Sequence, residues 1–390
     1  MKNRKLLKFL VLLHIVIITI SNFLVSIPIE IFGIKLTWAA FSFPLVVVAT
    51  DLTVRLVGKS IATKTISFAF PFAIISSFLI LSGCSKSKEK LAFRGFPKSF
   101  PSEFINCLSK DWEFYPIKNI DSKNFSYNST LQEKTDLLVL NDGWISDLPI
   151  NSLQEIKADN IRNNFSKQTS AFLDGLGKDY KKKLFPLAVS PWVILFRNED
   201  SLALNNKNSW EVVFSSSLTK QIVFPKSPYL LISIAQKIDL VNDFSKIKSQ
   251  AQSFDDMNAL NWVVSGRANA AVLPLSSCVD SLVKDPRLSV LLPQEGSPLN
   301  WTVLASPSAS LESFPTDWFN SLWSPTYLRR VISKGFLPPT NLLDLRRKNI
   351  NVPKKYQSIF LPEESVWNKC WSLPILSSQE KKDLALNWNN

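Results

Sequence analysis

The stretch Phe78–Lys90, FLILSGCSKSKEK, divides the chain into two parts of different physical character. Most residues before it are apolar, whereas short apolar runs alternate with polar ones after it. Within it, Leu81-Ser82-Gly83-Cys84 has the form of a lipoprotein box, in which a cysteine follows an apolar run and small residues. Residues 85–90 then have the composition of a polar tether. Cys84 is therefore a candidate lipid anchor, and the alternative is that it ends a third membrane helix.

Three apolar runs precede this boundary, at about residues 6–27, 34–50 and 66–83. Runs of this length and composition are typical of helices that cross a bilayer. Basic residues open the first run, and Arg55, Lys59 and Lys64 lie between the second and third. The positive-inside rule places those flanks in the cytoplasm and everything after Cys84 on the far side. Residues 1–84 are thus predicted to form a membrane segment of two to three transmembrane helices.

The composition excludes several classes of function. The 390 residues are 46% hydrophobic and 20% charged, with a formal net charge of +13. The basic residues are scattered among acidic ones, so they indicate a solvated surface and predict no nucleic-acid partner. The single histidine, His14, lies in the first apolar run, and the four cysteines have no C-x-x-C spacing. Zinc binding and a Ser-His or Cys-His nucleophile in the second part are therefore not expected. One disulfide among the three remaining cysteines is left open.

The second part alternates strand-like and helix-like segments. Six short apolar runs predict buried strands: TDLLVL, PWVILF, WEVVF, QIVF, ANAAVLPL and LSVLL. The segments SPYLLISIAQKIDLV and DMNALNWVVSGRA predict helices. Strands that alternate with helices over this length indicate an α/β fold with two lobes.

The start of the chain resembles one known family. The segment Ala49–Gly58, ATDLTVRLVG, together with ITISNFLVSIPIEIFGIKLTWAAFSFP upstream, carries the resemblance. Residues from about 1 to 65 resemble the amino-terminal part of the queuosine-precursor transporter family of inner-membrane proteins. The positions that match its motif are Asn22, Asp51, Thr53 and Arg55. The resemblance is incomplete, because that family has about six helices and this chain supplies two or three.

The second part resembles another family, through several segments in the same order. These are TDLLVLNDGWISDL, NSWEVVF, NALNWVVSGRANAAVLPLSSCV, DPRLSVLLPQEGSPLNWTVLASPSAS and SPTYLRRVISKGFLPPTNLL. Residues from about 88 to 345 resemble the extracytoplasmic solute-binding proteins of ABC transporters, in the spermidine/putrescine-binding branch. The resemblance implies a type II periplasmic-binding-protein-like fold. Lobe 1 is expected at about 91–188 and 301–345, lobe 2 at about 189–300, and a carboxy-terminal extension at 346–390 that packs on the lobes.

The same resemblance implies where a ligand would bind. Family members that bind polyamines flank the methylene chain with aromatic rings and hold the ammonium groups with carboxylates. Here Phe96, Trp144 and Trp301 match aromatic positions, and Asp142 lies near Trp144. Lys226 and Tyr229 stand where the family has carboxylates.

Most of the acids expected for a dication are therefore absent. Arg94 and Lys226 favour an anionic or zwitterionic ligand instead, with solvated surface charges as the alternative. Trp192, Trp210 and Trp262 are expected to pack within the lobes.

Together these features predict a membrane-anchored solute-binding protein. It would deliver a small polar solute to ABC permease subunits from the periplasmic side of the inner membrane, without catalysis, cofactor or metal. The alternative is a fragment of a queuosine-precursor membrane transporter fused to a binding domain. An enzyme is a third class, which the missing histidine in the second part disfavours.

Overall fold

The computed structural model describes residues 2–25, 28–31, 34–37, 39–83, 90–96, 100–117, 134–197, 208–240, 244–310, 314–341, 345 and 356–389. The chain divides into two compact units, Met1–Glu89 (the helical unit) and Lys90–Asn390 (the lobed unit). Cys84, the candidate lipid anchor, and residues 85–89 of the tether lie outside the described residues.

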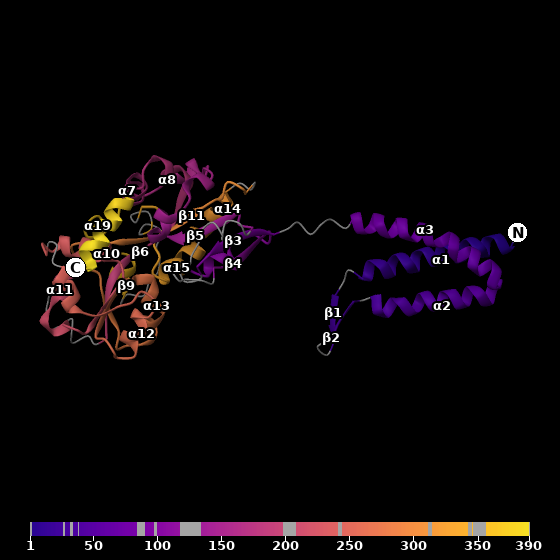
Figure 1. Ribbon diagram of the computed structural model, residues 1–390, viewed down its shortest axis with the longest axis horizontal. Coiled ribbons are helices and arrows are strands. Elements are labelled where there is room, and N and C mark those ends of the chain that lie inside the picture. The colour runs from indigo at the N-terminus through magenta and orange to yellow at the C-terminus, as the bar shows by residue number, and fades with distance from the viewer. Residues whose placement is uncertain are drawn as a thin grey trace. The chain divides into compact units, whose positions relative to one another are not determined.

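Over its described residues, the helical unit consists of three long helices and one hairpin (Figure 1). The helices are α1 (Lys2–Val25), α2 (Ala39–Val57) and α3 (Lys59–Gly83), and each contacts the other two. The hairpin pairs β1 (Pro28–Ile31) with β2 (Ile34–Thr37). The second apolar run therefore begins as a strand, because its first residues form a backbone ladder with the segment before them.

Small and polar side chains lie between these helices. On α3, Ala62, Thr65, Ala69 and Ala73 are buried at the three- and four-residue spacing of one helix face. His14 on α1 is also buried, and its Nδ1 donates a hydrogen bond to the carbonyl of Leu10. Small residues allow helix backbones to approach closely, so the contacts here rest on close backbone packing.

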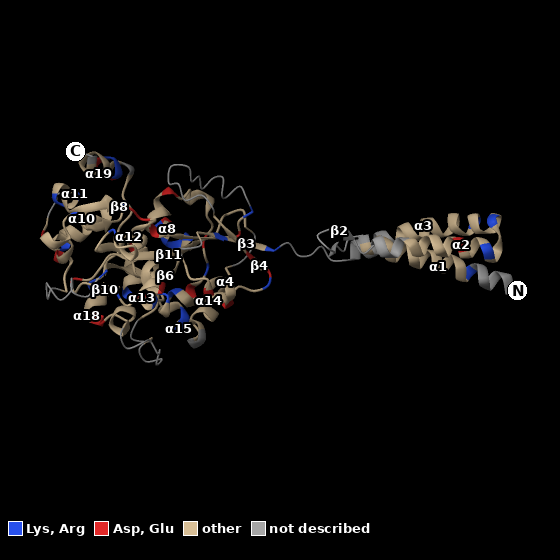
Figure 2. Ribbon diagram, turned by 90° about the horizontal axis from the view of Figure 1, so that it is seen from below, with Lys and Arg blue, Asp and Glu red and all other residues tan. Residues whose placement is uncertain are grey.

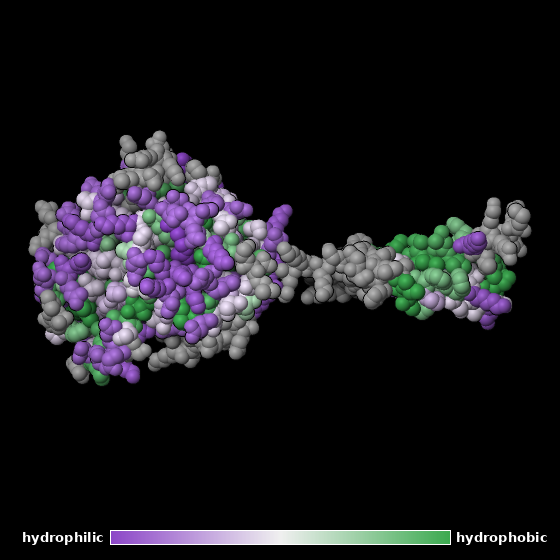
Figure 3. Space-filling view, turned by 90° about the horizontal axis from the view of Figure 1, so that it is seen from above, coloured by the Kyte–Doolittle hydropathy of each residue, from purple (hydrophilic) through white to green (hydrophobic). Residues whose placement is uncertain are grey.

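Large apolar side chains cover the outside of the same helices, as Figure 3 shows. Charged residues gather toward one end of the helix group (Figure 2), where Lys8 and Lys64 line one shallow groove. Over the residues that the structure describes, none of the helices has the length and hydropathy of a candidate membrane span. The finding gives no support to the predicted transmembrane helices.

The lobed unit contains a nine-stranded mixed sheet with the strand order β4-β3-β5-β11-β6-β9-β7-β8, and β10 also pairs with β6. Its strands are β3 (Leu91–Gly95), β4 (Trp112–Pro116), β5 (Leu137–Asn141), β6 (Leu184–Phe196), β7 (Ile222–Phe224), β8 (Ala251–Phe254), β9 (Ala270–Pro274), β10 (Ser289–Leu291) and β11 (Leu299–Ala305). The mixed α/β fold predicted from alternating runs is confirmed.

One long strand joins the two halves of this sheet. Residues 184–191 of β6 pair with β11, whereas residues 192–196 pair with β9. We call the β4-β3-β5-β11 half lobe 1 and the β9-β7-β8 half lobe 2. The chain passes from lobe 1 to lobe 2 within β6, at Pro191–Trp192, and returns through residues 292–298 just before β11, so two chain segments form the connection.

Helices cover both halves of the sheet. Those of lobe 1 are α4 (Glu103–Asn106), η1 (Asp142–Asp147), η2 (Ile150–Ser152), α6 (Asp159–Arg162), α7 (Lys167–Gly175), α8 (Lys178–Lys183), α14 (Thr316–Leu322) and α15 (Pro325–Ser333). Those of lobe 2 are η3 (Trp210–Phe214), η4 (Ser216–Leu218), α10 (Pro228–Lys237), α11 (Phe244–Gln250), α12 (Ala259–Val264) and α13 (Leu275–Lys284).

Five of the six predicted strands are strands, and the sixth is not. The run WEVVF forms the 3₁₀ helix η3, because the Ser209 side chain caps it by accepting a hydrogen bond from the Glu211 N–H. Trp210 is fully buried there, and its indole Nε1 donates to the Gly296 carbonyl at 2.9 Å. The apolar run was therefore read correctly as core and wrongly as a strand.

The end of the chain contains α17 (Gln357–Phe360), α18 (Glu364–Trp367) and α19 (Ser378–Asn389). Phe360 and Trp367 are buried in the same hydrophobic cluster as residues of both lobes. Cys107, Cys278 and Cys370 are free thiols, so the disulfide left open by the sequence is not formed among them.

Candidate functional site

Four of the predicted ligand residues lie together in lobe 1. Phe96 follows β3, Asp142 and Trp144 belong to η1 directly after β5, and Trp301 lies near the start of β11. The neighbouring strands β3, β5 and β11 bring them together, since parallel strands β3 and β5 end at the same edge and β11 runs antiparallel from it. The Phe96 and Trp144 rings stack with centroids 5.6 Å apart.

Asp142 is the one carboxylate among these four, and its environment opposes ionisation. Its side chain accepts hydrogen bonds from the backbone N–H groups of Trp301, Gly143 and Asp142 itself, which favour the charged form. Burial outweighs them and raises the pKa of Asp142 to about 7. The carboxyl is thus a group that can be neutral or charged near neutral pH.

Trp301 is fully buried in this structure. Its ring stacks on that of Phe172 of α7, with centroids 4.6 Å apart and an interplanar angle of 9°. Its indole Nε1 donates to the Ser372 hydroxyl at 2.8 Å. The carboxy-terminal extension therefore covers this predicted ligand residue.

Lys226 and Tyr229 lie in lobe 2, between β7 and the first turn of α10. The Lys226 backbone N–H donates to Asp256 at 2.9 Å, which ties this turn to the segment after β8. Partial burial and the negative charge of Glu380 in α19 raise the pKa of Tyr229. Both residues are therefore held on a defined turn whose surroundings include α19.

Arg94 is engaged locally. Its Nε donates to the Lys134 carbonyl at 3.0 Å, and its guanidinium lies 5.2 Å from the centre of the Tyr115 ring on the neighbouring strand β4. These contacts orient the side chain toward the β4 edge.

The remaining residues singled out from the sequence lie as follows. Trp192 and Trp262 are half-buried and pack against the hydrophobic clusters, and the Trp262 indole donates to Asp255 at 3.2 Å. In the helical unit, Asp51 and Arg55 form an exposed ion pair of 2.8 Å. Thr53 is buried and donates to the Ala49 carbonyl, whereas Asn22 is exposed.

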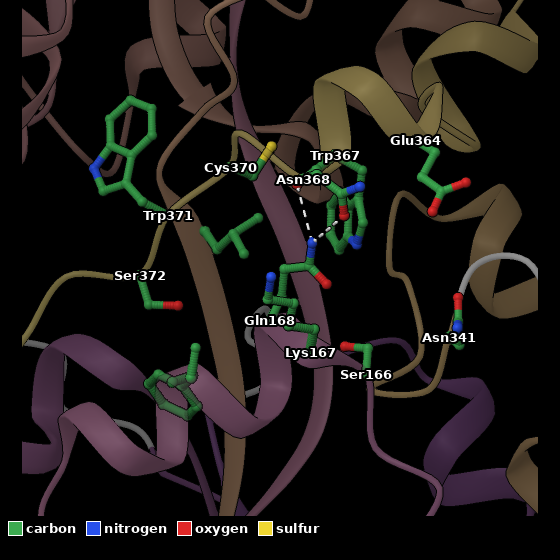
Figure 4. Close-up of a pocket in the computed structure, with 13 residues that line it drawn as sticks. Ser166, Lys167, Gln168, Asn341, Glu364, Trp367, Asn368, Cys370, Trp371 and Ser372 are labelled. Atoms are coloured by element: carbon green, nitrogen blue, oxygen red, sulfur yellow. Dashed lines mark hydrogen bonds between the residues drawn. The ribbon is translucent and has the colours of Figure 1, made fainter.

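A pocket of about 520 Å³ lies between α7 and the carboxy-terminal extension; we call it the α7 pocket (Figure 4). Its lining from lobe 1 and the return strand is Ser166, Lys167, Gln168, Ala171, Phe172, Leu299 and Asn341. The extension contributes Glu364, Trp367, Asn368, Cys370, Trp371 and Ser372.

Polar and aromatic side chains together line this pocket. Gln168 Nε2 donates to Asn368 Oδ1 at 2.9 Å, which fastens the extension to α7. Burial raises the pKa of Cys370 to about 12, so this thiol stays protonated and unreactive at neutral pH. Sequence reasoning missed this pocket, because its two walls are separated by about 200 residues and the segment VWNKCW offered only an apolar signal.

Among the described residues, no cluster of three or more His, Cys, Asp or Glu side chains is arranged to hold a metal ion. The chemistry available at the lobe 1 residues is therefore that of aromatic stacking, one titratable carboxyl and backbone donors.

Comparison with known proteins bears on each unit separately. No protein-family profile matches the chain. Over 78 residues the chain is 45% identical to the queuosine precursor transporter of Escherichia coli (strain K12), a match that covers 20% of this chain and 35% of that protein. A probable queuosine precursor transporter of Haemophilus influenzae is 36% identical over 107 residues, 44% of its length. The chain thus spans less than half the length of these curated relatives.

The fold is similar to that of solved solute-binding proteins. One is the spermidine/putrescine ABC transporter substrate-binding protein PotD of Streptococcus pneumoniae, with a TM-score of 0.61, 12% identity, and coverage of 77% of this chain and 98% of that protein. Another is the TpPotD lipoprotein of Treponema pallidum, with a TM-score of 0.55, 10% identity, and coverage of 77% and 98%. Both resemblances predicted from the sequence are confirmed, the second one for the fold alone.

Proposed function

We propose that the lobed unit is a solute-binding domain that takes up a small polar solute between its lobes and presents it to the permease subunits of an ABC transporter. The observation that carries the proposal is that two chain segments connect the lobes, β6 at Pro191–Trp192 and the residues just before Leu299, since lobes joined in this way can close on a ligand by hinge motion. The similarity to solved solute-binding proteins supports it.

The proposed binding residues are Phe96, Asp142, Trp144 and Trp301 from lobe 1 and Lys226 and Tyr229 from lobe 2. Arg94, whose guanidinium lies over Tyr115 of β4, is a further candidate. Aromatic faces suit the apolar part of a solute, and a carboxyl with a pKa of about 7 gives at most one negative charge. One carboxyl balances one ammonium group, and Lys226 supplies a positive charge for an anionic one. This charge set suits a zwitterionic solute better than a polyamine.

Binding is tested on the full chain in detergent, by thermal shift and calorimetry against spermidine, putrescine, neutral amino acids and dicarboxylates. We expect a zwitterionic member to raise the melting temperature of the wild type and not that of Trp144→Ala. Trp192→Phe serves as a control for aromatic packing. Response to polyamines alone would refute the charge argument, and conversion of the solute, followed by mass spectrometry, would refute binding without catalysis.

We further propose that the helical unit lies in the inner membrane, with the lobed unit on the periplasmic side. Exposed Val47, Val48, Phe68 and Phe70 would be costly in water and favourable in lipid. The basic flanks of α1 and of the α2–α3 turn suit a cytoplasmic end. Resistance of the full chain to alkaline extraction from membranes is expected, and full release into the supernatant would contradict it.

Cys84 is the proposed lipid anchor if the chain is processed. Intact mass of the membrane-extracted protein tests this: we expect a diacylated species that begins at Cys84. A species that keeps Met1 to Gly83 would instead assign the anchor to the helices.

A second candidate function is passage of a queuosine precursor through the helical unit. The 45% identity over 78 residues to a queuosine precursor transporter favours it. Because the chain spans only 35% of that protein, the function would need further helices from another subunit. Uptake of a labelled queuosine precursor by cells that carry this chain alone is expected to stay at background.

A further inference from the structure

The carboxy-terminal extension touches the connection between the lobes. The Trp371 N–H donates to the Ser297 carbonyl at 3.0 Å, and the Leu299 N–H donates to the Trp371 carbonyl at 2.8 Å. Through these bonds Trp371 lies alongside Pro298, and the two chain segments run parallel there. Backbone hydrogen bonds at this point oppose rotation of one lobe against the other, because rotation would stretch them.

Beyond this point the extension is fastened to lobe 1. The Lys381 Nζ donates to the Ser146 hydroxyl at 2.7 Å and lies 3.3 Å from the Asp147 carboxylate, both in η1. The pair stands two to three residues after Trp144, on the element that also carries Asp142.

The same helix is fastened to lobe 2. Trp388 of α19 packs edge-on against Phe244 of α11 and Phe254 of β8, with centroids 5.7 and 5.4 Å apart. The Lys248 ammonium lies 5.6 Å from the Trp388 ring centre, and α19 also contacts α10. Figure 1 shows α19 beside α10, as their contacts require.

These contacts coincide with the proposed ligand residues. Ser372 accepts the indole hydrogen of Trp301, Lys381 holds the element of Trp144, and Glu380 lies close enough to Tyr229 to affect its ionisation. The extension thus engages ligand residues of both lobes through different side chains.

We propose that residues 371–389 are an intramolecular latch that holds the two lobes together and must release before solute gains access to Trp301. The effect on solute rests on the function proposed above, whereas the latch itself is a property of the fold. Release at η1 and at Trp388 would free the lobes to move about Pro191–Trp192 and the residues just before Leu299.

The test uses the full chain in detergent and needs no solute. Spin labels are placed on p-acetylphenylalanine at two exposed positions, Lys157 in lobe 1 and Lys284 in lobe 2, and pulsed electron resonance gives their distance distribution. The latch variant is Lys381→Ala with Trp388→Ala. The control is Lys382→Ala, which changes an exposed neighbour on the same helix.

We expect one narrow distribution in the wild type and in Lys382→Ala, and a broader one shifted to longer distance in the latch variant. Hydrogen exchange at the Leu299 amide is expected to rise on the order of tenfold in the latch variant, with β9 unchanged. Superimposable distributions for all three proteins, with exchange in β9 and at the Leu299 amide unchanged, would overturn the latch.

The latch and the proposed function fail separately. If no solute of the panel binds to the wild type or to the latch variant while the distance between the spin labels still shifts, the latch is supported and the proposed solute binding is refuted. If a solute binds to the wild type and to the latch variant with equal affinity, and the spin-label distances of the two proteins coincide, the proposed solute binding is supported and the latch is refuted.

Discussion

The helical unit and the lobed unit distribute their side chains in opposite ways. In the helices, Ala62, Ala69 and Thr65 are buried, while Phe68 and Phe70 are 61% and 53% exposed. In the lobes, Phe93, Trp210 and Trp301 are fully buried, and most exposed positions carry polar or charged side chains. Figure 3 shows the contrast as apolar side chains on the visible face of the helices and mostly hydrophilic ones on that of the lobes.

The contrast teaches that the two units are stabilised differently. The lobes gain stability from removing large apolar side chains from water, which is the dominant favourable term in folding. The helices leave such side chains outside and bury small ones, so water is a poor environment for their surface. Each prediction below tests whether the two units respond to the same kind of change in opposite ways.

The largest difference is expected for removal of an aromatic side chain. Trp301→Ala should lower the free energy of unfolding of the lobed unit by about 3–5 kcal/mol, because a buried stack and a hydrogen bond are lost. Phe70→Ala should leave the melting of the chain in detergent unchanged, because its ring packs in no core cluster. Chemical denaturation of both variants measures the difference, and equal losses would show that the units do not differ in this way.

The second-largest difference between the two units is expected when a charged side chain replaces an exposed apolar one. Val48 and Val283 are both 62% exposed, one on α2 and the other on α13. Val48→Lys should disfavour the membrane-bound form by about 2.5–3.5 kcal/mol if lipid covers this face. Val283→Lys should change stability by less than about 0.5 kcal/mol, as surface substitutions do. Partition of each variant between membranes and supernatant is the measurement, and identical partition would contradict a lipid-facing α2.

A pH-dependent difference is expected from Asp142 in the lobed unit. Its folded pKa of about 7 lies above the ordinary value of 3.8, so between these values the folded state holds a proton that the unfolded state releases. The free energy of unfolding should therefore fall as the pH rises from about 4 to 7. Asp142→Asn should remove this slope in urea titrations.

Asp285 serves as the control for that titration. Hydrogen bonds from Arg287 lower the pKa of Asp285 to about 2. The contribution of the Asp285 carboxylate to stability is therefore present above about pH 4 and is lost as the pH falls toward 2. Asp285→Asn should leave the slope between pH 4 and 7 intact. A slope that survives in Asp142→Asn would mean that another group is responsible.

The smallest effect is expected for surface ion pairs. Arg55 pairs with Asp51 at 2.8 Å in the helical unit, and Lys334 pairs with Asp280 at 2.8 Å in the lobed unit. Arg55→Ala and Lys334→Ala should each cost less than about 0.5 kcal/mol, and less again in high salt. Thermal melts at two ionic strengths test this. A loss of stability several times larger for Arg55→Ala than for Lys334→Ala would indicate that the Arg55–Asp51 pair lies in a less polar environment than water.

Sequence patterns predicted the strands best where apolar runs were short and bounded by turns. The runs in β5, β6, β7, β9 and β10 were identified, because a buried strand forms an apolar segment whatever its partners are. The run WEVVF failed, since the Ser209 cap and the Trp210 indole bond decide its conformation, and neither is visible in an apolar pattern. The strand Ile34–Thr37 was missed for a similar reason, because its conformation depends on pairing with the upstream strand Pro28–Ile31.

The candidate site shows the same division. A family resemblance pointed to Phe96, Asp142, Trp144 and Trp301, and the strand order brings these four together in lobe 1. Sequence reasoning could not have found Ser372 on the Trp301 indole or Lys381 on η1, since those contacts join residues 71 and 235 positions apart.

By itself, the sequence determined where the chain changes character, which runs form the core, and that the second part is α/β. Composition and periodicity are local, and they fix how each segment interacts with water. Only the tertiary structure decided that the extension crosses both lobes, that Trp301 is covered, and that burial shifts the Asp142 carboxyl toward neutrality. These depend on which distant side chains exclude water from a given atom, a property that no stretch of sequence carries alone.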